Sequence, residues 1–244
     1  MRSTSSSGIS DRATGRLKRS EISRLCAALF GMTPLAASCQ DWAIANPRFA
    51  AFLDSYQGKI GKKLRSITDS DGYPDLLAEL DVAHRLLADR SFALIYEPFR
   101  AEHQRGPDFG VTFKTHTSFT VEVRHLRPST TAIDQRVAAV LAEKLRQLPA
   151  STPNVLALKN ETGSYIAAEH LQTALNGLAA IAQRRDDEAC AQRGFAGARD
   201  LLRRMERLSA VAVLEPPPEV LYEHPRARHG LPTDLRKALA RVFA

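Results

Sequence analysis

Two acidic residues and one arginine, placed along two strand-like segments, are the group in this chain best suited to chemistry. Asp108 follows Gly106-Pro107, and Glu122-Val123-Arg124 begins 14 positions after Asp108. Carboxylate oxygens are the ligands that Mg²⁺ prefers, and a guanidinium beside them can stabilise charge that develops on a phosphoryl group. Together the three side chains are suited to metal-dependent hydrolysis of a phosphodiester.

The segments around these residues predict a β-hairpin. Ser118–Leu126 is rich in β-branched and aromatic residues, as strands are, and side chains alternate between the two faces of a strand. Glu122 and Arg124 therefore share one face, where burial would require them to be paired or metal-bound. Residues 108–114 predict the partner strand, with a short polar turn between the two. We therefore expect Asp108 to lie close to Glu122.

This pattern resembles the motif of the PD-(D/E)xK nucleases, which have the restriction-endonuclease-like fold. The family motif is Pro-Asp, then a variable stretch, then an acidic residue, any residue and Lys; this chain has Pro107-Asp108 and Glu122-Val123-Arg124. The family core runs helix, three strands, helix, strand, and the resemblance covers roughly 74–160. The same order is predicted here from a helix at Leu76–Asp89, strands at Phe92–Tyr96, 108–114 and 118–126, a helix at Ala132–Leu148 and a strand at Asn154–Leu158.

The resemblance implies that Asp108 and Glu122 hold Mg²⁺ or Mn²⁺ and that DNA is the substrate. It further implies a supporting carboxylate from Glu79 on the first helix, and a hydrogen bond from Gln147 to the phosphate or to a ligand. Each of these two residues has a plainer interpretation. Glu79 also suits a solvent-facing position on a helix, and Gln147 also suits the end of a helix.

One position departs from the family pattern, because Arg124 stands where the family has Lys. Arginine stays protonated at physiological pH and cannot act as a general base. It can still stabilise charge on the phosphate, and a bound metal can itself generate the hydroxide nucleophile. Three functions therefore remain open: a metal-dependent DNA endonuclease, a catalytically inactive module of the same fold that binds nucleic acid or a protein partner, or a purely structural role.

Charge composition agrees with a nucleic-acid partner without selecting one. The chain of 244 residues has 34 basic and 27 acidic residues, which gives a formal net charge of +7, and affinity for phosphate backbones is largely electrostatic. The basic cluster Lys59–Arg65 suits either a contact with the DNA backbone or the solvated face of a helix. The helix expected at Ala132–Leu148 has a polar face that carries Arg136, Glu143, Lys144 and Arg146.

Cysteine usage and hydropathy indicate a cytoplasmic protein. Cys26, Cys39 and Cys190 are odd in number and far apart, so they predict neither a disulfide framework nor a metal site. No apolar run approaches the ~18 residues of a membrane span, so we expect no membrane association. The segment Leu25–Cys39 resembles a secretory leader only loosely, because Glu21 precedes it and both glycine and proline interrupt it.

We expect three regions along the chain: a disordered tail at 1–19, a helical extension at 20–73 and an α/β domain at 74–244. The domain would contain the nuclease-like core at 74–160, followed by C-terminal helices and extra strands at 161–244. The alternation of strands and helices predicts a mixed central sheet flanked by helices. Outside the core, helices are expected at Glu21–Phe30, Asp41–Tyr56 with an interruption at Pro47, Ile166–Arg185, Gly194–Leu208 and Asp234–Phe243, and strands at Ala210–Leu214 and Val220–Tyr222.

Overall fold

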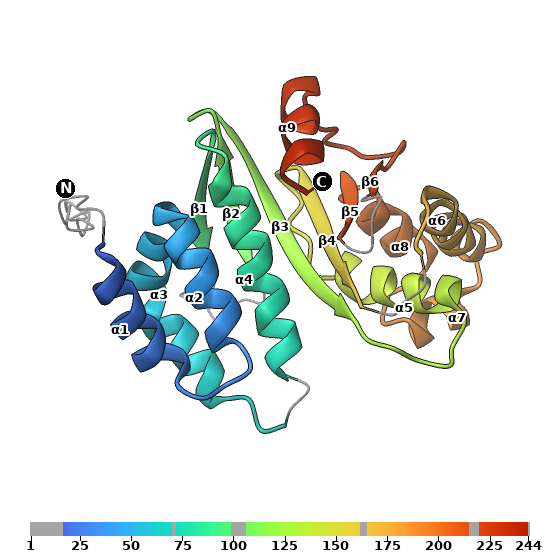
Figure 1. Ribbon diagram of the computed structural model, residues 1–244. Coiled ribbons are helices and arrows are strands. Elements are labelled where there is room, and N and C mark those ends of the chain that lie inside the picture. Colours follow the sequence, from blue (N-terminus) through green and yellow to red (C-terminus); the bar gives the residue numbers. More distant parts are fainter. Residues whose placement is uncertain (1–16, 70–71, 99–105, 162–164, 215–219, 244) are drawn as a thin grey trace, which may run out of the picture.

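A computed structural model of the chain describes residues 17–69, 72–98, 106–161, 165–214 and 220–243 (Figure 1). These residues form an α/β fold with a six-stranded mixed sheet flanked by helices, as the sequence predicts. The expected disordered tail lies almost wholly outside the described residues, so that expectation stays a prediction.

The sheet has its strands in sequence order. They are β1 (Phe92–Tyr96), β2 (Phe109–Phe113), β3 (Thr117–Leu126), β4 (Asn154–Asn160), β5 (Ala210–Leu214) and β6 (Val220–Glu223). The pairs β1–β2, β2–β3 and β5–β6 are antiparallel, whereas β3–β4 and β4–β5 are parallel. The two parallel connections pass through helices, as such crossovers usually do.

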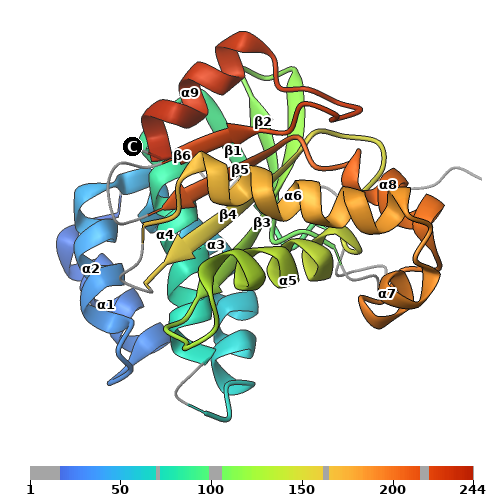
Figure 2. The same ribbon diagram turned by 90° about the vertical axis from the view of Figure 1, so that its right-hand side faces the viewer.

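Helices cover both faces of the sheet (Figure 1). One face is covered by α1 (Arg19–Phe30), α2 (Ala36–Ala45), α3 (Pro47–Arg65), α4 (Gly72–Ala88) and α9 (Thr233–Phe243). The other face is covered by α5 (Ile133–Leu145), α6 (Ala168–Gln183), α7 (Asp187–Gln192) and α8 (Ala198–Met205). Figure 2 shows α5 and α6 lying across this second face.

Side-chain alternation along the central strands divides the core into two hydrophobic clusters, one on each face. From β3, Phe119, Val121 and Val123 belong to the cluster on the face of α3 and α4, whereas Leu126 belongs to the cluster on the face of α5. β4 contributes to both clusters and is buried along its whole length. This burial confirms the prediction of a central strand there.

The elements around the predicted site appear in the expected order, α4-β1-β2-β3-α5-β4. The hairpin of β2 and β3 is confirmed, and β5 and β6 extend the same sheet as predicted. The likeness of this arrangement to the restriction-endonuclease-like core stays a prediction.

The interruption expected near Pro47 is confirmed, but the second helix is longer than predicted. Asn46 ends α2, and its side-chain oxygen accepts hydrogen bonds from the N–H groups of Arg48 and Phe49 at the start of α3. Proline is well placed in this first turn. α3 then continues to Arg65, so the basic cluster of the sequence is helical.

The helix expected at Gly194–Leu208 is wrong in its first turn. Gly194 and Gly197 have φ angles of +77° and +148°, which glycine adopts far more readily than other residues, so α8 begins only at Ala198.

The short helix α7 was not expected. Asp186 caps α7 by accepting a hydrogen bond from the N–H of Ala189.

None of the described helices is long and apolar enough to cross a membrane. The segment with leader-like composition contributes to α1 and α2, where Cys26 and Cys39 are buried. These two cysteines and Cys190 are free thiols.

Candidate active site

The hairpin of β2 and β3 places the two predicted metal ligands side by side at its open end. Phe109 pairs with Val121, so the next position of the antiparallel register sets Asp108 opposite Glu122. Asp108 lies just outside the ladder, and the N–H of Val123 donates to Asp108 Oδ2 at 2.8 Å. This hydrogen bond holds the Asp108 carboxylate against β3.

Glu122 is a buried carboxylate with one oxygen left unpaired. The residue is 3% exposed, and Lys144 Nζ of α5 donates to Oε1 at 2.5 Å. Oε2 is buried and has no hydrogen-bond partner in the described part of the chain. Leaving a buried charged oxygen unpaired is unfavourable, so a cation bound at Oε2 would stabilise the site.

Burial raises the pKa values of both acids. Burial raises the pKa of Glu122 to about 7, helped by the negative charge of Asp108 and opposed by Lys144. Burial likewise raises the pKa of Asp108, opposed by the charge of Lys63 and by the hydrogen bond from Val123. Two carboxylates that repel each other in this way favour binding of a proton or a cation.

A third carboxylate, that of Glu79 on α4, interacts with Asp108. Glu79 is only 6% exposed, which excludes the solvent-facing interpretation. Lys63 Nζ of α3 donates to both oxygens of Glu79, at 2.5 and 2.7 Å, and the Tyr96 hydroxyl donates to Oε2 at 2.8 Å. Burial and the charge of Asp108 raise the pKa of Glu79 to about 8, opposed by Lys63 and Tyr96.

Asp108 therefore connects two charged pairs that come from opposite faces of the sheet. The Glu79–Lys63 pair is built from α4 and α3, and the Glu122–Lys144 pair from β3 and α5. Figure 1 shows α4 and α5 on the two sides of the sheet. When ionised, the three carboxylates exceed the two ammonium groups by one negative charge. A bound metal cation would offset this excess negative charge.

Arg124 and Gln147 are not part of this cluster. The Arg124 guanidinium lies 3.8 Å from the Glu143 carboxylate, and its side chain is 37% exposed. No ion pair of Arg124 with Asp108 or Glu122 is present among the described residues. Gln147 lies just beyond the end of α5, where its backbone N–H donates to the carbonyl of Lys144. The structure thus brings together Asp108, Glu122 and Glu79 of the five predicted site residues.

Two lysines of the cluster are absent from the site that the sequence predicts. Lys144 was expected on the polar face of its helix, yet its side chain is 11% exposed. It follows Leu141 by three positions and Val137 by seven, a spacing that places it at the edge of the buried face of α5. Lys63 likewise follows the buried Ile60 by three positions. A search of the sequence for basic residues at the edge of the apolar stripe of a helix would have identified both Lys144 and Lys63.

The carboxylate oxygens of Asp108 and Glu122 fit a divalent metal that has few protein ligands. Within the described residues, no group of three or more His, Cys, Asp or Glu side chains is placed to hold a metal ion. A metal between Asp108 and Glu122 would therefore have two carboxylate ligands, with water and substrate oxygens completing its shell, which is how Mg²⁺ is usually bound. Glu122 Oε2, which has no hydrogen-bond partner among the described residues, is the oxygen of this acid left for it.

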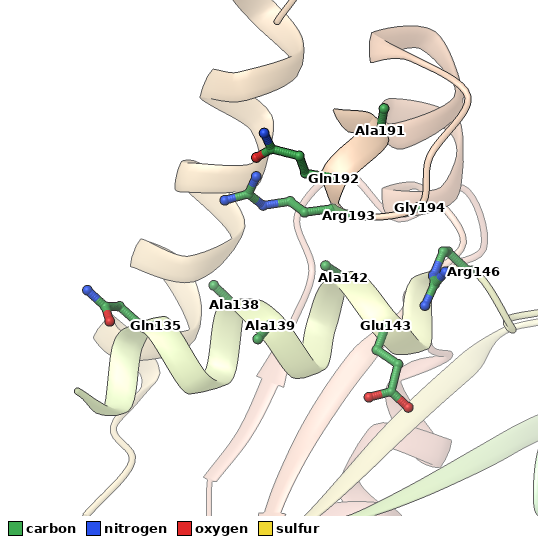
Figure 3. A pocket seen from close by; sticks show the side chains of 10 residues that line it. All are labelled: Gln135, Ala138, Ala139, Ala142, Glu143, Arg146, Ala191, Gln192, Arg193 and Gly194. Carbon is green, nitrogen blue, oxygen red and sulfur yellow. The ribbon is translucent and has the colours of Figure 1, made fainter. Parts of the chain in front are cut away.

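A groove of about 1000 Å³ runs along α5 on the side that faces α7 (Figure 3). Alanine side chains such as Ala142 form part of its wall, and Arg193 and Arg146 contribute guanidinium groups. Arg146 lies against Gly194, where an added Cβ would come within 2.3 Å of Arg146 Nη1. The bare backbone of Gly194 therefore makes room for the arginine at this end of the groove.

Comparison of the chain with protein-family models, with curated proteins and with solved structures found no match. The resemblance to nucleases therefore depends on the motif residues and on the order of the elements around them.

Proposed function

We propose that the protein hydrolyses phosphodiester bonds of DNA in a metal-dependent reaction at Asp108 and Glu122. The observation that supports this most is the buried, unpaired Oε2 of Glu122 beside a second carboxylate. Perturbed carboxylates of this kind gather at functional sites. A divalent cation is the ligand whose charge and preference for oxygen suit them.

Each residue of the cluster has its own role in the proposed reaction. Asp108 and Glu122 hold Mg²⁺ or Mn²⁺, which when bound supplies an acidified water and polarises a phosphate oxygen. Lys144 fixes the Glu122 carboxylate through Oε1 and places a positive charge where the phosphate would lie. The attacking water releases a proton to solvent as its oxygen bonds to phosphorus, the bond from phosphorus to the leaving oxygen breaks, and that oxygen takes a proton from solvent. Lys144 thus replaces Arg124 in the role first expected for the motif arginine.

The groove along α5 offers the DNA strand a path away from the carboxylates. Arg146 follows Lys144 by two positions, so this end of the groove lies within one helical turn of the proposed phosphate contact along the chain. Arg146 and Arg193 can each contact a phosphate through two N–H groups. The small alanine side chains of α5 allow the strand to approach the helix closely (Figure 3).

The alternative, an inactive module of the same fold, is favoured by one observation. Lys63 already neutralises Glu79, and Lys144 already binds one oxygen of Glu122. A protein that had lost catalysis would retain its buried acids only if cations of its own paired with them. Such a module would bind nucleic acid or a protein partner and would have no requirement for a metal.

Incubation of supercoiled plasmid DNA with the protein and Mg²⁺ or Mn²⁺ tests the proposal. Wild type is expected to nick the plasmid, and Asp108→Ala and Glu122→Gln are expected to lower the rate at least about 100-fold, because each removes a metal ligand. Asp234→Ala, which removes an exposed carboxylate on α9, is the matched control and should cleave as wild type does. Equal cleavage by wild type and Asp108→Ala, or no cleavage by wild type with either metal, would contradict the proposal.

A further inference from the structure

Helix α3 is fixed in place against the site by two lysines one turn apart. Lys59 Nζ donates to the carbonyl oxygens of Tyr96 and Glu97, at 2.6 and 3.1 Å, which attaches α3 to the end of β1. Lys63 Nζ, four positions later, lies against both oxygens of Glu79 at 2.5 and 2.7 Å. The helix thus delivers one ammonium group to a carboxylate beside Asp108.

The surroundings of the Lys63 ammonium are those of a bound cation. Burial lowers the pKa of Lys63, but the charges of Glu79 and Asp108 more than offset that effect and the pKa is raised overall. The Tyr96 ring centre lies 5.9 Å from Nζ, and the Tyr96 hydroxyl donates to Glu79 Oε2. The ammonium is therefore held by carboxylate oxygens of the kind that would otherwise bind a divalent ion.

We infer that the Lys63 ammonium takes the place of a second metal ion, so that the site binds one divalent cation rather than two. In two-metal sites the ions lie about 3.5–4 Å apart in a cluster of carboxylates. Asp108 lies between the two acids, because the hairpin register sets it opposite Glu122, and the next residue, Phe109, pairs with Tyr96, whose hydroxyl binds Glu79. Lys63 neutralises Glu79, while the unpaired Oε2 of Glu122 leaves the other position to the metal.

This inference rests on the proposed metal site at Asp108 and Glu122, and it assigns Glu79 a different task from theirs. Glu79 holds Lys63 and does not hold the ion. Helix α3 then belongs to the site, because it supplies a positive charge that the acids require. A protein with this arrangement neutralises Glu79 with an ammonium group of its own and requires only one metal from solution.

Titration of the metal-free protein with Mn²⁺, followed by the electron paramagnetic resonance signal of free Mn²⁺, measures the stoichiometry directly. Wild type is expected to bind one Mn²⁺ per chain. Lys63→Gln is expected to bind two, because Glu79 loses its cation beside Asp108. Lys62→Gln removes the same charge from an exposed neighbour on α3 and should bind one. The double variant Lys63→Gln/Glu79→Gln should also bind one, since it removes both the ammonium and the vacated carboxylate.

The outcomes separate this inference from the function on which it rests. One Mn²⁺ per chain in Lys63→Gln, with circular dichroism showing a folded protein, would overturn the inference and leave the proposed function standing. No Mn²⁺ bound by wild type would overturn both. If Lys63→Gln does not fold, Glu79→Gln decides: one Mn²⁺ per chain supports the inference, and loss of Mn²⁺ binding would overturn it, because Glu79 would then be a metal ligand.

Discussion

Asp81 and Glu122 are both buried and both paired with a lysine, but of these two acids only Asp81 has both oxygens paired. Asp81 of α4 is 4% exposed; its Oδ2 accepts from Lys159 of β4 at 2.7 Å and its Oδ1 from Arg85 at 3.1 Å. Glu122 is equally buried, but Lys144 pairs with Oε1 alone and Oε2 has no hydrogen-bond partner in the described structure.

The difference distinguishes an acid that serves the fold from one that is suited to a ligand. A complete buried ion pair contributes little net stability, yet removing one partner is strongly unfavourable. Asp81 has two cationic partners and fits this structural role. Glu122 has one, and the neighbouring charge of Asp108 repels it further. Burial and a lysine partner are therefore weak signs of function, whereas an unpaired oxygen beside a second acid is a stronger one.

The largest expected effect concerns Lys144, the cation proposed to act on the phosphate. Lys144→Ala is expected to lower kcat/KM for plasmid cleavage about 10²–10³-fold, because the ammonium contacts the Glu122 carboxylate. Arg124→Ala is expected to lower kcat/KM less than about threefold, since the guanidinium pairs with Glu143 and is partly exposed. Steady-state cleavage kinetics on folded variants measure both effects. A larger loss in Arg124→Ala than in Lys144→Ala would return the role to the motif arginine.

The contrast between the two acids predicts opposite effects on stability and metal binding. Asp81→Asn is expected to lower the free energy of unfolding by about 3 kcal/mol, because it removes the buried charge that Lys159 and Arg85 both bind. Its Kd for Mn²⁺ should stay within about threefold of wild type. Asp108→Asn should raise that Kd about 100-fold without lowering stability, since it relieves repulsion among the acids.

Urea denaturation and calorimetric titration with Mn²⁺ give the two quantities for each variant. The comparison fails if Asp81→Asn weakens Mn²⁺ binding as much as Asp108→Asn does. It also fails if Asp108→Asn destabilises the metal-free protein as much as Asp81→Asn.

Stability of the metal-free protein is expected to fall by about 1–3 kcal/mol between pH 5 and pH 8. Glu122 and Glu79 have pKa values of about 7 and 8 in the folded protein, above the ordinary value of 4.5. In this pH range the folded state therefore holds protons that the unfolded state has already released, so stability is lost as pH rises through the folded-state pKa values.

Urea denaturation across this pH range, without divalent metal, measures the slope. Glu122→Gln is expected to make the decline shallower, because one of the two titrating groups is removed. A stability that is flat or rises toward pH 8 would show that these acids are already ionised at pH 5 in the folded protein.

The smallest expected effect lies in the groove along α5. Arg146→Ala is expected to raise the Kd for a short DNA duplex about threefold and to reduce the salt dependence of binding by about one phosphate contact. Fluorescence anisotropy in Ca²⁺ without Mg²⁺ measures the binding. Arg19→Ala, at an exposed position of α1 on the other face of the sheet, is the matched control. Equal effects of the two substitutions would mean that the groove does not contact DNA.

The pairing of Asp108 with Glu122 could be predicted because it follows from local structure. The strand composition of 118–126 and the short turn before it fix the hairpin, and the hairpin register sets the two acids opposite each other. The buried strand β4 was predictable for the same reason, since its apolar run has no polar interruption before Lys159.

The two lysines could not be predicted as site residues because their positions depend on how helices pack. Lys144 meets Glu122 only because α5 crosses the face of β3, and Lys63 meets Glu79 only because α3 continues to Arg65. Helical spacing places each lysine at the edge of a buried stripe, but it does not say which strand lies beneath. The departure of Arg124 from the nuclease motif could be seen in the sequence, whereas the proposal that Lys144 takes its role required the tertiary structure.

The position of a bound Mn²⁺ in a crystal soaked with that ion would test the metal site most directly. We expect one anomalous difference peak, about 2.1 Å from Asp108 Oδ1 and Glu122 Oε2, with Lys63 still bound to Glu79. Absence of a peak between these two carboxylates at saturating Mn²⁺, with Glu122 Oε2 bonded to water or protein instead, would contradict the proposed site.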